Sequence, residues 1–221
     1  ILMSLNLDKI KNKGIFKKNI KTIRITKKII HEKIGTPIYD KQTINKKPNV
    51  GVINGLYATN DGHGGLSQIQ IKKNYINDNF FKLTGSQGKI MKESVECSFT
   101  TASNYVKNYK KFDLQKYIQN NFPNGFHVHV QDTATPKDGP SAGCAFTCAF
   151  ISLILNKEID NKVAMTGEID LFGNISKIGG LQYKIIGAKH AGISKIIVPK
   201  ENYNDYISIQ KDNPTLFDNT F

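Results

Sequence analysis

The feature that most constrains this chain is a Pro- and Gly-rich turn that runs directly into an apolar stretch. The turn reads Pro-Lys-Asp-Gly-Pro-Ser-Ala-Gly over residues 136–143, and residues 142–155 form the longest nearly apolar stretch of the 221-residue sequence. Because this stretch is apolar almost all round, it predicts a buried helix. Pro140 suits the first turn of that helix, where its missing N–H costs nothing. Ser141 is then expected at the positive end of the helix dipole.

Ser141 has two interpretations on this evidence. A serine at a helix start is most often an N-cap, whose hydroxyl accepts a backbone N–H of the first turn. The other interpretation is a nucleophile, because the helix N-terminus stabilises a developing oxyanion. The turn taken alone favours the cap.

Lys184 is the second unusual residue. It follows a Gly-Gly pair at 179–180, and the apolar pattern over 181–191 predicts a helix with residues 181, 184, 185 and 188 on one stripe. Lysine is rarely buried, so one on an apolar stripe needs a reason. Desolvation would lower its pKa from about 10.4 toward neutrality, and a neutral amine beside a hydroxyl can act as its general base. The alternative is a lysine whose stem packs while its ammonium reaches solvent.

Several motifs in a fixed order give a resemblance to one family. They cover roughly residues 47–205, and an ordered set is far more specific than a single short pattern. The matching segments are 55–59, 83–88, 127–130, 136–143, 164–168, 178–181 with Lys184, 191–193 and 198–202. Together they resemble the proteolytic domain of Lon, the ATP-dependent serine protease.

The resemblance implies roles for five residues. Ser141 would be the nucleophile and Lys184 the general base of a Ser–Lys dyad, a known variant of triad chemistry. Thr166 would orient the amine of the lysine. Asp138 and Gly139 lie in the segment before the serine, whose backbone could block or help form the oxyanion site. Without the resemblance, Thr166 reads as a buried strand threonine and Asp138 as an ordinary turn residue.

The remaining pattern predicts a mixed fold. Strands interspersed with helices and no internal repeat indicate an α/β (α+β mixed) domain. The resemblance implies the Lon protease domain fold, which is ribosomal protein S5 domain 2-like, over residues 48–221. The expected strands are 50–58, 66–72, 126–131, 163–168 and 195–199, and the expected helices are 88–109, 113–119, 142–155 and 181–191.

Residues 1–35 are interpreted as a remnant of the small helical ATPase subdomain that precedes the protease in Lon, and 36–47 as a linker. Thr26 is a plausible N-cap and Gly35 a plausible stop for a helix ending this remnant. A strand is expected just before it, from residue 23. The end of the chain, 212–217, does not resemble the closing strand and helix of the family, so the chain is either truncated there or diverged.

No phosphate-binding Gly-x-x-x-x-Gly-Lys-Ser/Thr motif occurs. The expectation is therefore that this chain carries no cofactor and no metal, and that ATP and Mg belong to an ATPase domain missing from it. No apolar run reaches the roughly 18 residues that a membrane span needs.

The resemblance implies a serine endopeptidase domain that degrades unfolded or damaged polypeptides and works as a homo-hexamer in the full-length protein. The alternative is a non-catalytic Lon-fold assembly or nucleic-acid-binding module, which the presence of both Ser141 and Lys184 disfavours. The net charge is +13, but residues 1–50 hold 13 Lys and Arg against three acidic residues. The basic excess lies outside the protease-like region, in a segment that contains no nucleic-acid-binding motif. Nucleic acid is therefore not favoured as a partner.

One residue near the site departs from the family pattern, and two histidines offer an alternative to Lys184 as the base. Gln70 stands where the family usually has a glutamate, so charge tuning of Lys184 by that position is in doubt. His127 and His129 alternate with apolar residues on one strand face and offer a rival base for Ser141. The exposed-face interpretation of both histidines is preferred because the lysine matches the family better.

The three cysteines, Cys97, Cys144 and Cys148, do not form a disulfide framework. Cys144 and Cys148 are expected to be small apolar fillers, and zinc binding with a histidine is a remote alternative. Segments 143–144 and 189–192 look closer to organellar members of the family, which implies the mitochondrial matrix, with the cytoplasm or another organelle as alternatives. No signal or transit peptide is evident, and a mature or excised fragment would have lost one.

Overall fold

The structure, a computed structural model, describes residues 25–35, 44–76, 79–110, 113–132 and 136–217. The chain divides into two compact units, 1–40 and 41–221. In the first, helix α2 spans Lys27–Ile34. Thr26 Oγ1 accepts the N–H of Ile29 at 3.4 Å, and Gly35 ends the helix at φ 101°. The cap and the stop predicted from sequence are thus confirmed. Residues 23–24 of the expected strand and 36–43 of the expected linker lie outside the described residues.

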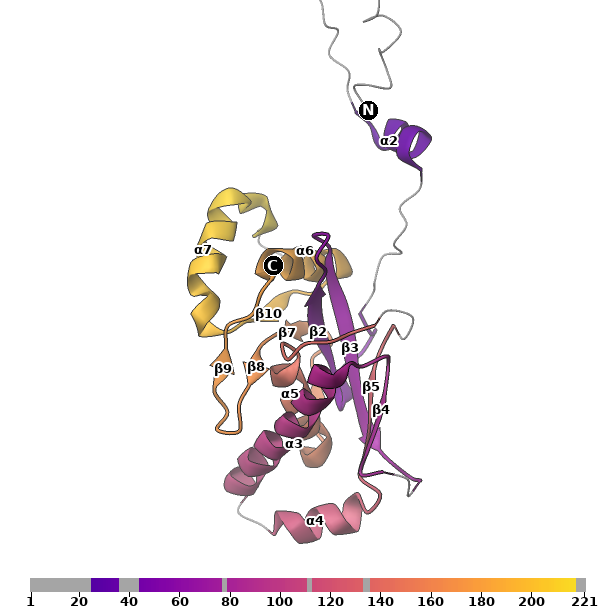
Figure 1. The fold of residues 1–221 in the computed structure, drawn as a ribbon, viewed down its shortest axis with the longest axis vertical. Helices are drawn as coiled ribbons and strands as arrows, with labels where there is room; N and C mark the ends of the chain where they lie inside the picture. The colour runs from indigo at the N-terminus through magenta and orange to yellow at the C-terminus, as the bar shows by residue number, and fades with distance from the viewer. Residues whose placement is uncertain (1–24, 36–43, 77–78, 111–112, 133–135, 218–221) are drawn as a thin grey trace, which may run out of the picture. The chain divides into compact units, whose positions relative to one another are not determined.

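The second unit is built on a six-stranded mixed sheet (Figure 1). Its order is β10-β7-β2-β3-β5-β4, with antiparallel pairs β2–β3 and β3–β5 and parallel pairs β10–β7, β7–β2 and β5–β4. The strands are β2 (Val52–Ala58), β3 (Gly64–Lys73), β4 (Phe81–Thr84), β5 (Phe126–Val130), β7 (Val163–Met165) and β10 (Lys195–Ile197). The mixed α/β class expected from sequence is confirmed.

Short ribbons and helices complete the unit. Strand β1 (Asn49–Val50) pairs with β6 (Glu158–Ile159), and β8 (Glu168–Ile169) with β9 (Ile175–Ser176), both antiparallel. The helices are α3 (Lys89–Lys110), α4 (Leu114–Asn121), α5 (Gly143–Leu155), α6 (Leu181–Ala191) and α7 (Tyr203–Asp212), with 3-10 turns η1 (Lys200–Asn202) and η2 (Pro214–Leu216).

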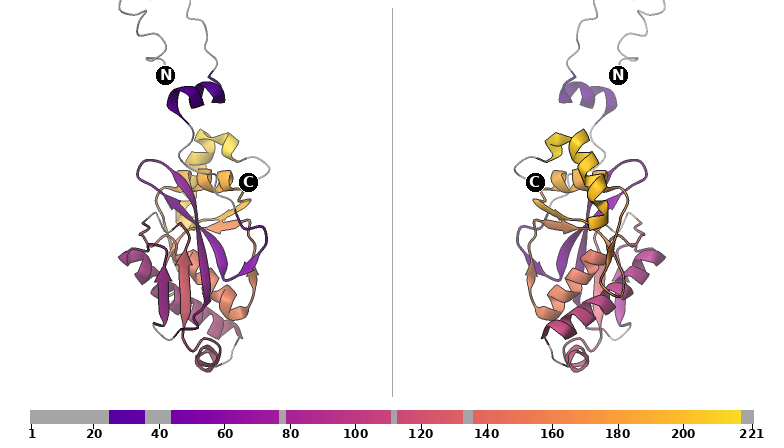
Figure 2. Two further views of the ribbon diagram at one scale, coloured as in Figure 1. Left: turned by 90° about the vertical axis from the view of Figure 1, so that its right-hand side faces the viewer. Right: turned by 90° about the vertical axis from the view of Figure 1, so that its left-hand side faces the viewer.

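The sheet carries helices on both faces (Figure 2). Successive side chains of a strand point to opposite faces, so apolar residues of one strand can pack against helices on either side. Ile69 faces the main core, which contains Phe146 and Phe150 of α5. Leu66, three residues earlier and on the opposite face, packs with Ala188 of α6. The turn that leads into α5 and the helix α6 therefore approach the sheet from opposite faces, Ser141 lying in that turn and Lys184 in α6. Among the described residues, no helix has the length and apolar character to cross a membrane.

Besides the two-residue strands β6 and β9 and the 3-10 turns, strand β4 and helix α7 were not expected from sequence. Strand β4 is four residues long and only half-buried, so its pattern is too short to stand out. Helix α7 buries only Ile209, and its apolar stripe is correspondingly weak. The chain thus continues from η1 into a helix over 203–212.

Candidate active site

Ser141 lies in the turn before α5 and not in the helix. The N–H of Gly143 donates to the carbonyl of Pro140 at 3.0 Å, which closes a tight turn around the serine. The helix begins at Gly143, and its N-cap, Ala142, makes no side-chain capping bond. The expectation that Pro140 occupies the first helical turn is therefore wrong. The cap interpretation of Ser141 is wrong as well, because the turn leaves its hydroxyl outside the capping position.

The backbone around Ser141 is fastened to the chain that leaves β7. The carbonyl of Ser141 accepts the N–H of Gly167 at 2.7 Å and the hydroxyl of Thr166 at 3.1 Å. The N–H of Cys144 donates in turn to the carbonyl of Gly167 at 2.9 Å. These bonds fix the direction in which the side chain of Ser141 leaves the turn.

Lys184 projects from the second turn of α6 into this junction. Its residue is only 3% exposed, so the interpretation in which the ammonium escapes to solvent is wrong. The Nζ atom donates to Ser141 Oγ at 3.2 Å and to Thr166 Oγ1 at 3.0 Å. Serine, lysine and threonine thus meet although they are far apart in sequence.

Burial also sets the protonation of the lysine. Desolvation lowers the pKa of Lys184 from 10.5 to about 8. With that pKa, about a tenth of the amine is neutral at pH 7, compared with roughly three in ten thousand for an unperturbed lysine. A neutral amine held against a hydroxyl can remove its proton, so this geometry supports a nucleophile activated by a neighbouring base.

Asp138 does not reach the Ser–Lys pair. Its Oδ1 accepts the N–H of Met91 in the first turn of α3 and the N–H of Gly139, each at 2.9 Å. The N–H of Gly88 also donates to the carbonyl of Lys137 at 2.7 Å. Asp138 therefore caps α3 from outside the helix and fastens the segment before the serine to the start of that helix.

The same contacts bear on the oxyanion site. Gly139 has φ 124°, a region that favours glycine, and its N–H is engaged by the carboxylate of Asp138. Within the described part of the chain, the N–H groups of Ser141 and Ala142 have no hydrogen-bond acceptor. These two amides, at the N-terminus of α5, are the free backbone donors beside the serine hydroxyl.

The rival residues lie elsewhere on the sheet. His127 Nε2 and His129 Nδ1 contact the hydroxyl of Thr84 at 2.9 and 2.8 Å. Gln70 donates to the side chain of Gln68 at 2.9 Å. The basic group that is hydrogen-bonded to Ser141 is the lysine. Both histidines are half-buried, which differs from the exposed face expected for them.

Cys97, Cys144 and Cys148 are free thiols. Cys144 Sγ lies 3.6 Å from the sulfur of Met165, as expected for a packing residue.

Sequence reasoning did not identify Asn202 as part of the support for α6. This side chain is fully buried and exchanges two hydrogen bonds with the peptide groups of Ile178, at 3.0 and 2.9 Å. Glu201 accepts the N–H of Lys177 at 2.9 Å. Together they fix the segment that leads to Gly180, the left-handed residue that precedes the first residue of α6. The only sequence signal was the motif at 198–202, which indicated family and not contact.

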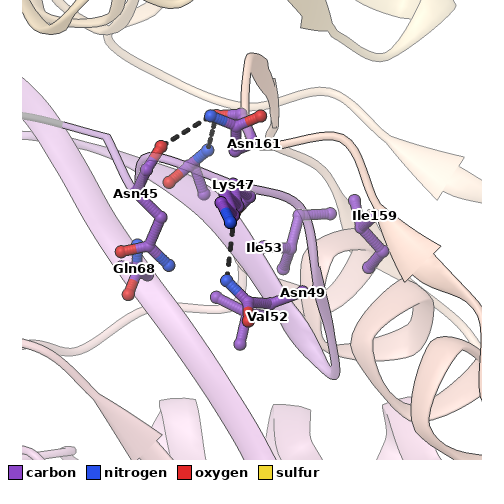
Figure 3. Close-up of a pocket in the computed structure, with 9 residues that line it drawn as sticks. Asn45, Lys47, Asn49, Val52, Ile53, Gln68, Ile159 and Asn161 are labelled. Atoms are coloured by element: carbon purple, nitrogen blue, oxygen red, sulfur yellow. Dashed lines mark hydrogen bonds between the residues drawn. The ribbon is translucent and has the colours of Figure 1, made fainter.

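A small pocket lies away from the Ser–Lys pair, where the segment from Asn45 to Asn54 meets Gln68 and the turn after β6 (Figure 3). Asn161 donates to the carbonyl of Asn45 at 2.5 Å, and Asn54 donates to the carbonyl of Asn161 at 3.0 Å. These amides join the segment entering β1 to the sheet, so we assign the pocket a structural role.

Comparison with known families places the site in context. Residues 24–215 match the family described as the Lon protease (S16) C-terminal proteolytic domain. A Lon protease homolog of Acanthamoeba polyphaga mimivirus is 49% identical over 201 residues, which is 88% of this chain and 19% of the relative.

Bacterial and mitochondrial relatives show the same pattern. The Lon protease of Borrelia duttonii is 41% identical over 89% of this chain and 24% of its own length. The mitochondrial Lon protease homolog of Saccharomyces cerevisiae is 38% identical over 83% of this chain and 16% of its own length. The chain thus spans less than a quarter of each of these three relatives.

Proposed function

The chain belongs to the family of C-terminal proteolytic domains of Lon proteases, and on that premise we propose that it cleaves peptide bonds through Ser141 and Lys184. The observation that carries the proposal is the contact of the buried Lys184 amine with the hydroxyl of Ser141 at 3.2 Å. The lowered pKa of Lys184 supports it, because only the neutral amine accepts a proton.

The steps follow from these positions. Ser141 Oγ attacks the peptide carbonyl carbon while its proton passes to Lys184 Nζ. The tetrahedral intermediate then breaks its C–N bond, and the departing amine takes the proton from the lysine. Water, deprotonated by the same amine, hydrolyses the resulting ester and releases Ser141. Each half-reaction returns the lysine to its neutral form.

Two further groups serve these steps. Thr166 Oγ1 accepts from Lys184 Nζ and donates to the carbonyl of Ser141, so its hydroxyl holds the amine at a fixed distance from the turn. The N–H groups of Ser141 and Ala142 are the donors for the oxyanion, and the dipole of α5 adds to their effect.

For the full-length protein we propose an ATP-dependent protease that degrades unfolded or damaged polypeptides as a homo-hexamer. The family supports this assignment, with ATP and Mg bound by parts of the protein other than this chain. Protein substrates are preferred to nucleic acid as partners, because the basic excess of the chain lies in residues 1–50. For the location we propose the mitochondrial matrix. The mitochondrial relatives of two yeasts support it, whereas other relatives are bacterial or viral. Cell fractionation distinguishes the matrix from the cytoplasm and from other organelles.

The test is hydrolysis of casein and of a fluorogenic peptide by the full-length protein, with and without ATP. The variants are Ser141→Ala and Lys184→Ala, with folding and assembly checked by thermal unfolding and gel filtration. Loss of cleavage in both folded variants is the expected result. Normal cleavage by Lys184→Ala would exclude the lysine as base and direct attention to His127 or His129. An inactive but folded wild type would favour the non-catalytic module.

A further inference from the structure

Helix α6 approaches the β2–β3 hairpin more closely than any side chain would allow. A Cβ placed on Gly64 would lie 2.0 Å from the carbonyl oxygen of Tyr183 and 3.0 Å from the amide nitrogen of Lys184. A Cβ placed on Gly187, one turn further along the helix, would lie 2.3 Å from the carbonyl carbon of Gly64. Neighbours at such distances would have to move. Here they are backbone atoms, which cannot rotate away.

The contact joins the strand directly to the part of the helix that carries the lysine. Gly64 begins β3, Gly187 is three residues after Lys184, and both glycines are at ordinary backbone angles. The need for glycine at these positions is therefore one of space. In Figure 1 the upper end of the hairpin meets α6, and the ring of Tyr183 lies 3.4 Å from a Cβ placed on Gly62.

We propose that the Gly64–Gly187 contact is a positioning device for the Ser–Lys pair, which holds α6 against the β2–β3 hairpin so that the Lys184 amine reaches Ser141 without water. This inference rests on the proposed function, because it concerns the distance and hydration of the same amine. Neither glycine touches the reacting atoms, so both are positioning residues.

The geometry leaves little tolerance for movement. The bonds from Lys184 Nζ to Ser141 and Thr166 are 3.2 and 3.0 Å, and a shift of the helix by about 1 Å would bring them beyond hydrogen-bonding distance. Misplacement by about 1 Å can lower a rate about 100-fold. The shift would also admit water along the hairpin, which weakens the desolvation that lowers the pKa of Lys184.

The experiment uses Gly187→Ala and Gly64→Ala in the full-length protein, with Gly179→Ala as the matched control. Gly179 precedes the same helix, has ordinary backbone angles, and a Cβ there would meet nothing within 4 Å. Alanine at 187 gains helix propensity of about 1 kcal/mol over glycine, which helps this variant to stay folded. The readout is kcat/KM for a fluorogenic peptide from pH 6 to 10, with thermal unfolding and assembly measured in parallel.

The expected result is a fall of at least tenfold at pH 7 in both variants. The acidic limb of their profile of kcat/KM against pH should move to higher pH. The control variant should keep the wild-type profile. If the pKa of Lys184 returned fully to its ordinary value, the fraction of neutral amine at pH 7 would by itself fall about 300-fold. If Gly64→Ala does not fold, Gly187→Ala decides.

A folded Gly187→Ala with the wild-type profile would overturn the inference. A rate lowered equally at every pH together with a lowered thermal unfolding midpoint would also overturn it, since that combination reports general damage to the fold. The proposed function fails separately, if Lys184→Ala is as active as wild type, whatever the glycine variants do.

Discussion

Replacing Thr166 by valine tests the site at the residue that joins its parts. The hydroxyl of Thr166 accepts from Lys184 Nζ at 3.0 Å and donates to the carbonyl of Ser141 at 3.1 Å. Valine has nearly the same volume, so the variant removes two hydrogen bonds and leaves no cavity. The carbonyl of Ser141 keeps its bond from Gly167, and the amine keeps its bond to Ser141.

The lost hydrogen bonding therefore affects mainly the amine of Lys184. Leaving a buried donor with one acceptor fewer costs about 1–3 kcal/mol of stability. Without Thr166 the amine is held by one bond in place of two, and we expect kcat to fall about 10- to 100-fold, equivalent to about 1.4–2.7 kcal/mol. Because an acceptor stabilises the ammonium more than the amine, its removal should lower the pKa of Lys184 further and move the acidic limb to lower pH.

The assay is kcat and KM for a fluorogenic peptide across the same pH range, with Thr166→Ser as the matched control. Serine keeps the hydroxyl and should restore most of the rate. A Thr166→Val protein that cleaves at the wild-type rate would refute the positioning role. Equal losses in the valine and serine variants would refute it too, because the methyl group and not the hydroxyl would then matter.

Three further predictions follow from the same contacts. The free energy of unfolding should rise by about 3 kcal/mol between pH 8 and 10.5. In this range Lys184 is still protonated in the unfolded chain but is neutral in the folded one, where its pKa is about 8. Urea titrations at each pH measure the rise, and Lys184→Met should remove it. Asp138→Ala removes the acceptor for the N–H of Met91, so it should cost about 1 kcal/mol and lower kcat less than tenfold; an unchanged unfolding midpoint in denaturant would contradict the capping role. Asn202→Ala leaves both peptide groups of Ile178 without their partner and should cost about 2–4 kcal/mol, measured by thermal unfolding, with Tyr203→Ala at the exposed neighbouring position as a control that stays near wild type.

The sequence predicted most of the elements that position the site. Long segments with clear apolar periodicity, such as 181–191, were located to within a residue or two, because their burial is repeated every turn. Strand β4 and helix α7 were missed because one is short and the other buries little. The start of α5 was predicted to within one residue, but Pro140 was wrongly placed in its first turn, since proline fits the first turn of a helix and also the tight turn that it occupies here.

The pattern of residues determined the family, the two residues proposed for catalysis and the apolar face that carries the lysine. Each of these is a local property of composition and order. Only the tertiary structure decided that Ser141 is not a cap, that Asp138 binds the start of α3, and that Gly64 and Gly187 bring α6 against the hairpin. These outcomes depend on contacts between segments far apart in the chain. Local spacing specifies which face of a helix is apolar, but the depth at which that helix packs follows from the atoms on the opposing strand.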